Sequence, residues 1–138
     1  MPLINFTKAD ILRSQIMESQ WASFNISAVT GPTKNAAGDG VNYIVHLTLI
    51  ENAVADLNGK EFKRTFSSKA MGMMIPLFAA VQGVDVQSIK DDFQADTDTL
   101  IGKKLDGKIT VDQYEGRFNN KVEEYLPYKK GVNMQPAF

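Results

Sequence analysis

The chain has 138 residues, 43% of them apolar and 22% charged, which is the size and composition of a single globular domain. It contains no cysteine, so disulfide bonds and thiolate metal sites are excluded. The net charge of −1 excludes binding to nucleic acid through a large overall positive charge, and any such binding must come from local clusters of basic residues.

The first expected element is a helix over residues 7–18. Thr7 and Asp10 have the spacing of a capping box, and apolar residues follow with a helical period. Residues 21–29 then form a strand of β-favouring residues, which a Gly-Pro pair should end.

The clearest strand covers residues 41–51, where side chains alternate between a mainly apolar face and a more polar one. Asn58 and Gly59 form a strong hairpin signal, and residues 60–66 make the third strand. The first three strands should therefore form a meander.

The hydrophobic period then becomes helical over residues 69–82. One of two preceding serines can cap this helix, Pro76 should kink or split it, and Gly83 should end it. A short second helix is expected over residues 84–93.

Two further strands are expected over residues 103–111 and 117–125, joined by a turn that contains glycine. The last strand stops at Pro127. Residues 129–138 contain glycine and proline and should form a flexible tail.

The expected order of helix, three strands, helix and two strands is that of an oligonucleotide/oligosaccharide-binding (OB) barrel. We therefore expect a mainly β protein: a five-stranded OB-like barrel with an N-terminal helix and a helix between strands three and four. Residues 1–128 form the single domain, with the helix in residues 1–18 and the barrel in residues 20–128.

No membrane segment is expected. Residues 1–10 lack the basic start and long apolar run of a signal peptide. The longest apolar stretches, near residues 41–50 and 71–81, fall well short of the roughly 20 residues that span a bilayer. We expect a soluble protein with no membrane partner.

Several short motifs follow a first strand led by Trp21. They are Gly-Asp-Gly-Val-Asn-Tyr at 38–43, Leu-Asn-Gly-Lys at 57–60, Leu-Ile-Gly-Lys-Lys at 100–104, and Tyr-Glu-Gly-Arg, Asn-Lys-Val and Tyr-Leu-Pro between 114 and 127. In their order and spacing the chain resembles a family of short phage proteins catalogued as domain of unknown function 669, similar to phage single-stranded DNA-binding proteins. The resemblance covers about residues 20–127.

The resemblance implies an OB-like fold and sequence-tolerant binding of single-stranded DNA during phage DNA replication or recombination. For a phage-encoded protein it also implies the cytoplasm of a bacterial host as the location.

Single-strand binding requires a cationic groove beside aromatic faces on which bases stack. The third, fourth and fifth expected strands supply residues of both kinds. The candidate nucleic-acid-binding residues are Lys60, Phe62, Lys63, Arg64, Lys103, Lys104, Lys108, Tyr114, Arg117, Phe118 and Lys121.

These residues also have structural interpretations. Phe62 and Phe66 fit the buried face of an alternating strand better than a stacking surface, although Arg64 shares their face. Tyr114 and Phe118 flank a glycine turn and are better stacking candidates. The lysines are either solvated surface groups or, as clusters on neighbouring strands, ligands for phosphate.

Other chemical groups favour structural roles. His46 has no evident partner for metal binding or general-base chemistry. The aspartates within residues 91–98 lack the spacing of an EF-hand loop and fit a solvated acidic loop. Met71, Met73 and Met74 fit core packing, or else an exposed patch for a partner.

The C-terminal Phe138 resembles the tips by which bacterial single-strand binders recruit replication or recombination proteins; the alternative is a frayed end. No nucleotide-binding glycine loop, nucleophile elbow or paired-carboxylate pattern is present in the sequence, so we expect no enzyme, no catalytic or metal-binding residue and no cofactor. The alternative function is a structural or protein-interaction module on the same barrel. The sequence is also compatible with a homo-oligomer, because a second copy can cover exposed strand edges.

Overall fold

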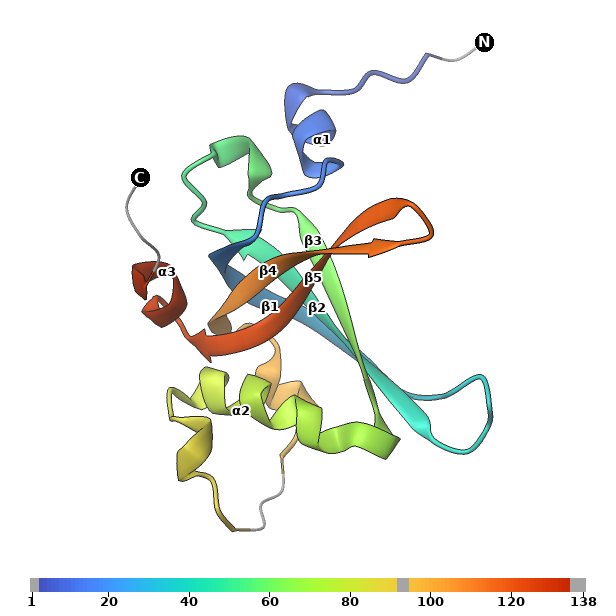
Figure 1. Ribbon diagram of the computed structural model, residues 1–138, viewed down its shortest axis with the longest axis vertical. Helices are drawn as coiled ribbons and strands as arrows, with labels where there is room; N and C mark the ends of the chain where they lie inside the picture. Colours follow the sequence, from blue (N-terminus) through green and yellow to red (C-terminus); the bar gives the residue numbers. More distant parts are fainter. Residues whose placement is uncertain (1–2, 92–94, 135–138) are drawn as a thin grey trace.

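Five antiparallel strands form one sheet in the order β3-β2-β1-β4-β5 in the computed structural model, which describes residues 3–91 and 95–134. The strands are β1 (Gln20–Lys34), β2 (Val41–Ile50), β3 (Glu61–Ser67), β4 (Lys104–Tyr114) and β5 (Arg117–Pro127). The sheet curls until β3 and β5 touch, although no ladder joins them in the part of the chain that is described (Figure 1). The predicted mainly β architecture and its order are confirmed, but the sheet does not close.

The core lies on the concave face of the sheet, as the alternation of buried and half-buried residues along β2 shows. Val45, Leu47 and Leu49 are fully buried, whereas the residues between them are half-buried. Leu47 lies opposite Ile26 of β1 on one side and Phe62 of β3 on the other, so three strands contribute to one apolar layer.

β1 is longer than the sequence predicted. It continues through Gly31 and Pro32, where the prediction ended it, because the pairing with β2 shifts register between Thr30 and Thr33. Pro32, which has no N–H to donate, therefore lies outside the regular ladder. As a result β1 and β2 extend together as a hairpin beyond the body of the sheet (Figure 1).

One open end of the sheet is covered by the segment between β3 and β4. The 3₁₀ helix η2 (Ser68–Met74) leads into α2 (Ile75–Gln82), so the predicted split near Pro76 is confirmed. Gly83 ends α2 in a left-handed conformation with φ 74°, also as predicted. Leu77 of α2 is fully buried against the core.

The remaining 3₁₀ helices are short. They are η1 (Ala55–Leu57) before β3, η3 (Val86–Ser88) and η4 (Thr97–Leu100). The second helix predicted over residues 84–93 is wrong where the structure describes that segment, which contains η3 alone; residues 92 and 93 lie outside the described residues.

The opposite end of the sheet is covered by the N-terminal segment. α1 (Lys8–Arg13) begins with the predicted capping box of Thr7 and Asp10, but it ends earlier than residue 18. Beyond it, Met17 is buried, and its backbone N and O are both hydrogen-bonded at 2.8 Å by the side chain of Asn120 in β5.

The C-terminal segment is docked as far as Met134, which corrects the prediction of a flexible tail from residue 129. α3 (Lys130–Met134) lies on the outer face of the sheet. There Gly131 packs so closely on Trp21 that a Cβ would meet the ring at 2.3 Å, and the N–H of Val132 donates to buried Asp106 at 2.7 Å. Residues 135–138 of the predicted tail lie outside the described residues.

The close packing at Gly107 generates a stability prediction. A Cβ there would lie 2.5 Å from Cγ1 of Val122 and 3.0 Å from the ring of Phe24. We expect Gly107→Ala to lower the free energy of unfolding by about 1–3 kcal/mol through overpacking, as measured by urea denaturation. The matched control is Gly72→Ala, where a Cβ meets nothing within 4 Å. Equal stability of the two variants would contradict this packing.

Candidate nucleic-acid interface

Lys60, one of the predicted groove cations, holds the segment at the end of the N-terminal helix. Its Nζ donates hydrogen bonds of 2.6 Å to the backbone oxygens of both Arg13 and Gln15. Burial lowers the pKa of Lys60. The cation thus satisfies carbonyls just after α1, where helices benefit from positive charge.

Phe62 is a core residue and not a surface for stacking bases. It is 7% exposed and meets Phe24 edge-on, with 5.4 Å between ring centroids. Phe66, on the same face, is 3% exposed. The structural interpretation of both phenylalanines is therefore confirmed.

Arg64 points into the seam between β3 and β5. Its guanidinium lies 5.4 Å from the ring centroid of Phe66 and beside Tyr125 of β5. Burial raises the pKa of Tyr125 to about 12, and the positive charge of Arg64 opposes that rise. Nε of Arg64 is buried without a hydrogen-bond partner among the described residues. Arg64 therefore lies on the same side of β3 as Phe62 and Phe66, as strict alternation along the strand predicts.

Lys63 is exposed on the outer face of β3, opposite His46 of β2. Nε2 of His46 lies 2.9 Å from the hydroxyl of Thr30 in β1. No group of three metal-ligating side chains occurs within residues 3–91 and 95–134. The outer face of β3 carries both exposed Lys63 and exposed Glu61, so it has charges of both signs.

The lysines at the start of β4 also lie on the outer face of the sheet, but β1 and β2 separate them from Lys63. Lys104 lies 3.9 Å from Glu51 and 5.3 Å from the ring centroid of Tyr128, and Lys108 lies 3.5 Å from Glu124. Lys103 is exposed just before the strand. The structure therefore does not bring these three lysines together with Lys63 in a single cationic groove.

The remaining predicted residues gather on the β4–β5 hairpin. Tyr114 and Phe118 are among its most exposed apolar groups, at 68% and 55%. Tyr114 lies directly opposite Arg117, so these two side chains share one face, whereas Phe118 lies opposite Gln113 on the other face. Each face of the hairpin tip thus carries one aromatic ring.

Lys121 lies on the same face as Tyr114, four residues along β5 from Arg117 and closer to the body of the sheet. Its Nζ forms an ion pair of 3.0 Å with Asp112 on β4. No ion pair is found for Arg117 among the residues that the structure describes. The hairpin tip therefore presents a guanidinium beside an exposed phenol ring, with the exposed carboxylate of Glu115 in the turn between them.

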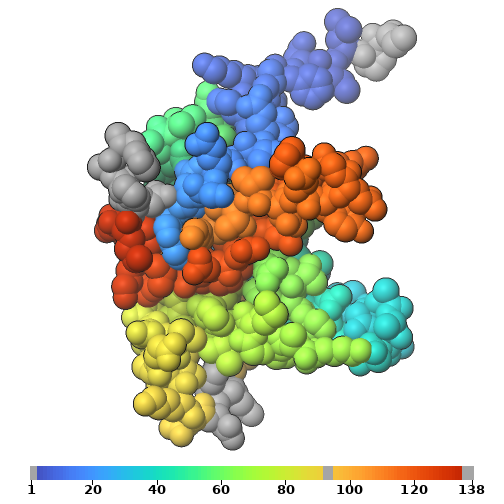
Figure 2. Space-filling view, in the orientation of Figure 1, coloured from blue at the N-terminus to red at the C-terminus, as the bar shows by residue number. Residues whose placement is uncertain are grey.

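The β4–β5 hairpin and the β1–β2 hairpin project from the same side of the molecule. Figure 2 shows the surface hollowed between them, with the first hairpin in orange and the second in cyan. β3 runs behind this hollow, between the two hairpins (Figure 1). An extended polymer that followed the hollow would pass the exposed rings of the hairpin and the outer face of β3.

Comparison with known proteins assigns no family. No protein-family model matches the chain, and no curated protein matches its sequence. None of the helices within the described ranges combines the length and apolar character needed to cross a bilayer. Phe138, the predicted docking tip, lies outside the described residues.

Sequence reasoning missed the cluster that fixes the C-terminal segment. Glu51, at the end of β2, accepts hydrogen bonds from the hydroxyl of Tyr128 and, at 2.9 Å, from Nζ of Lys129. These two donors lower the pKa of Glu51. The only sequence signal was the run Tyr-Lys-Lys after Pro127, which is equally typical of a solvated tail.

The Glu51 cluster predicts a pH dependence. Because the pKa of Glu51 is lowered in the folded state, its contribution to docking is present above the unfolded value of 4.5 and is lost as pH falls through the folded value. We expect fluorescence of Trp21, which lies under α3, to change below that pH in the wild type. In Glu51→Gln this component of the titration should be missing. Superimposable titrations of the two proteins would show that Glu51 does not hold the segment.

Proposed function

We propose that this chain is a sequence-tolerant single-stranded DNA-binding protein that acts in phage DNA replication or recombination. The observation that carries the proposal is the β4–β5 hairpin, which holds Tyr114 and Phe118 in solvent beside Arg117. Exposed aromatic rings beside a cation are the groups on which single-stranded nucleic acid stacks its bases. The resemblance to phage single-strand binders supplies the biological setting of the proposal.

The chemistry of the hairpin tip suits bases without regard to their identity. Every base has a π face, and stacking on an aromatic side chain contributes about 1–3 kcal/mol per base. Tyr114 and Phe118 lie on opposite faces of the hairpin, so a strand that crosses the tip can stack one base on each side. Sequence tolerance follows because this contact reads no base edge.

Phosphates in the proposal lie along the open side of the sheet. Arg117 contributes from the hairpin, Lys63 from the outer face of β3, and Lys121 after exchange of its partner Asp112. A surface ion pair contributes only about 0–1 kcal/mol, so a phosphate competes readily for Lys121. Lys104 and Lys108, on the surface beside the C-terminal segment, are not part of this proposed path.

The alternative is a structural or protein-interaction module that does not bind nucleic acid. The net charge of −1 and the pairing of several lysines with carboxylates favour it. Exposed Met73 also favours a protein partner. DNA binding and its dependence on the hairpin rings separate the two functions.

Titration of a labelled oligo-dT by fluorescence anisotropy tests the proposal. We expect Tyr114→Ala and Phe118→Ala each to weaken binding about tenfold or more, because each removes a stacking surface. Arg117→Ala should reduce the slope of log K against log salt by about 0.7, because one phosphate contact is lost. The control is Lys130→Ala, which removes an exposed cation from α3, on the side of the molecule away from the hairpins (Figure 1), and should leave affinity and slope unchanged.

Thermal unfolding verifies that each variant is folded before its affinity is compared. Absence of binding by the folded wild type at low salt would refute the proposal and leave the interaction module. An equal loss of affinity in all four variants would place the binding surface elsewhere.

A further inference from the structure

The N-terminal segment exposes an unusual amount of apolar surface for so short a stretch. We call residues 3–16 the arm. Its exposed apolar side chains are Leu3 (89%), Ile4 (76%), Phe6 (70%), Ile11 (51%) and Ile16 (47%). Together they expose on the order of 600 Å², against the roughly 800 Å² that each partner contributes to a standard protein interface.

The base of the arm is held firmly although its apolar side chains face solvent. Nε of Arg13 donates to the backbone oxygen of Asn58 at 3.0 Å, and Lys60 binds the oxygens of Arg13 and Gln15. No residue of α1 is buried. Figure 2 shows the arm, in dark blue, standing clear of the rest of the surface. Such a fixed, projecting apolar element indicates a docking role.

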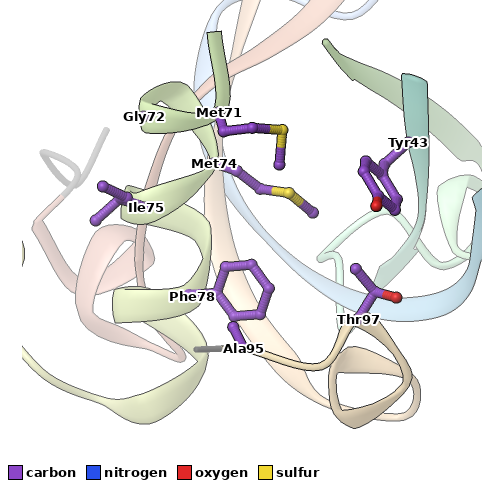
Figure 3. Close-up of a pocket in the computed structure, with 8 residues that line it drawn as sticks. All are labelled: Tyr43, Met71, Gly72, Met74, Ile75, Phe78, Ala95 and Thr97. Atoms are coloured by element: carbon purple, nitrogen blue, oxygen red, sulfur yellow. The ribbon is translucent and has the colours of Figure 1, made fainter. Parts of the chain in front are cut away.

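An apolar pocket with a volume of ≈ 340 Å³ lies at the other end of the molecule, between η2, α2 and the start of β2. Figure 3 shows Met71 and Met74 directed across it toward Tyr43, with Phe78 at its lower side. The lining residues are Tyr43, Met71, Gly72, Met74, Ile75, Phe78, Ala95 and Thr97. Methionine side chains adapt to the shape of an incoming apolar group.

The arm and the pocket are complementary in charge. Arg13 and Asp10 form an ion pair of 4.0 Å within the arm, which leaves exposed Lys8 as its remaining positive charge. The pocket wall formed by Ala95 and Thr97 is flanked by Asp96 and Asp98, which are both exposed. An apolar element that carries a basic residue therefore matches an apolar pocket with an acidic rim.

The arm cannot occupy the pocket of its own chain. α1 contacts η1 just before β3, whereas the pocket lies against η2 just after β3. β3 separates the two by about 23 Å at roughly 3.3 Å per residue. Phe6 lies two residues before Lys8, so its backbone reaches at most about 7 Å from the helix. Phe6 and Ile11 therefore reach a pocket of this kind only on another molecule.

From these observations we propose that the arm of one copy docks in the methionine pocket of the next copy. Phe6 and Ile11 enter the pocket, and Lys8 meets the acidic rim. Because the arm and the pocket lie at opposite ends of one molecule (Figure 1), the contact is head-to-tail and continues from copy to copy. This inference does not depend on DNA binding.

Analytical ultracentrifugation of the full chain without DNA tests the inference through two surface variants. We expect the wild type to increase in mass beyond a dimer as its concentration rises, less so at high salt. The arm variant, Phe6→Ser with Ile11→Ser, and the pocket variant, Met71→Lys, should each be monomeric. Val111→Ser, which removes an equally exposed apolar side chain from β4, should associate like the wild type.

A mixture of the two monomeric variants gives the sharpest result. The pocket variant retains an intact arm and the arm variant retains an intact pocket, so the mixture should form a heterodimer and stop there. A monomeric wild type, a wild type that stops at a dimer, or a mixture that stays monomeric would each overturn the proposal. Thermal unfolding within a few degrees of the wild type establishes that both variants are folded.

Discussion

The two end strands of the sheet, β3 and β5, meet without sharing a hydrogen-bonded ladder, and side chains fill the seam between them. Arg64 reaches in from β3 and lies beside Tyr125 of β5 and over the ring of Phe66. Arg64 is half-buried, and the ring of Phe66 and the phenol of Tyr125 compensate in part for the water that its guanidinium loses.

The cations on the surface of the sheet differ in whether they are paired with carboxylates. On the surface that α3 and the C-terminal segment cover, Lys104 and Lys108 lie beside Glu51 and Glu124. On the open side, Lys63 and Arg117 form no ion pair within the described ranges. Lys63 and Arg117 are thus available to a ligand on this side, although the net charge of the chain is −1. Net charge alone is therefore a poor guide to what this protein binds.

Local sequence patterns predicted the elements well, and long-range packing explains most of the errors. The capping box at Thr7, the split near Pro76 and the alternation of β2 each depend on neighbours in sequence, and all three are confirmed. Two other features, the path of β1 through Pro32 and the docking of α3, depend on a register shift and on a contact with Trp21, which no local pattern contains.

The candidate site shows the same division. Exposure of Tyr114 and Phe118 follows from a glycine turn that any reader of the sequence can locate. The use of Lys60 to hold α1 depends on carbonyl oxygens more than 40 residues away in the chain, and a lysine so engaged looks like any other in sequence. Predicted clusters of lysine therefore overstate the size of a cationic surface until the partners of each are known.

The DNA-binding surface of the hairpin is small, and this connects DNA binding with head-to-tail association. Neither proposal depends on the other. Two exposed rings and a few cations provide modest affinity for one copy on a flexible strand. A neighbour docked through its arm would experience a high effective concentration of the same strand, which strengthens binding without any new contact to DNA. Because the arm is anchored at Arg13 and Lys60 on the end of the molecule away from α2, a head-to-tail series would repeat the hairpin at a regular interval. Weak sites in a fixed repeat suit a ligand whose own chemistry repeats, as a phosphate backbone does.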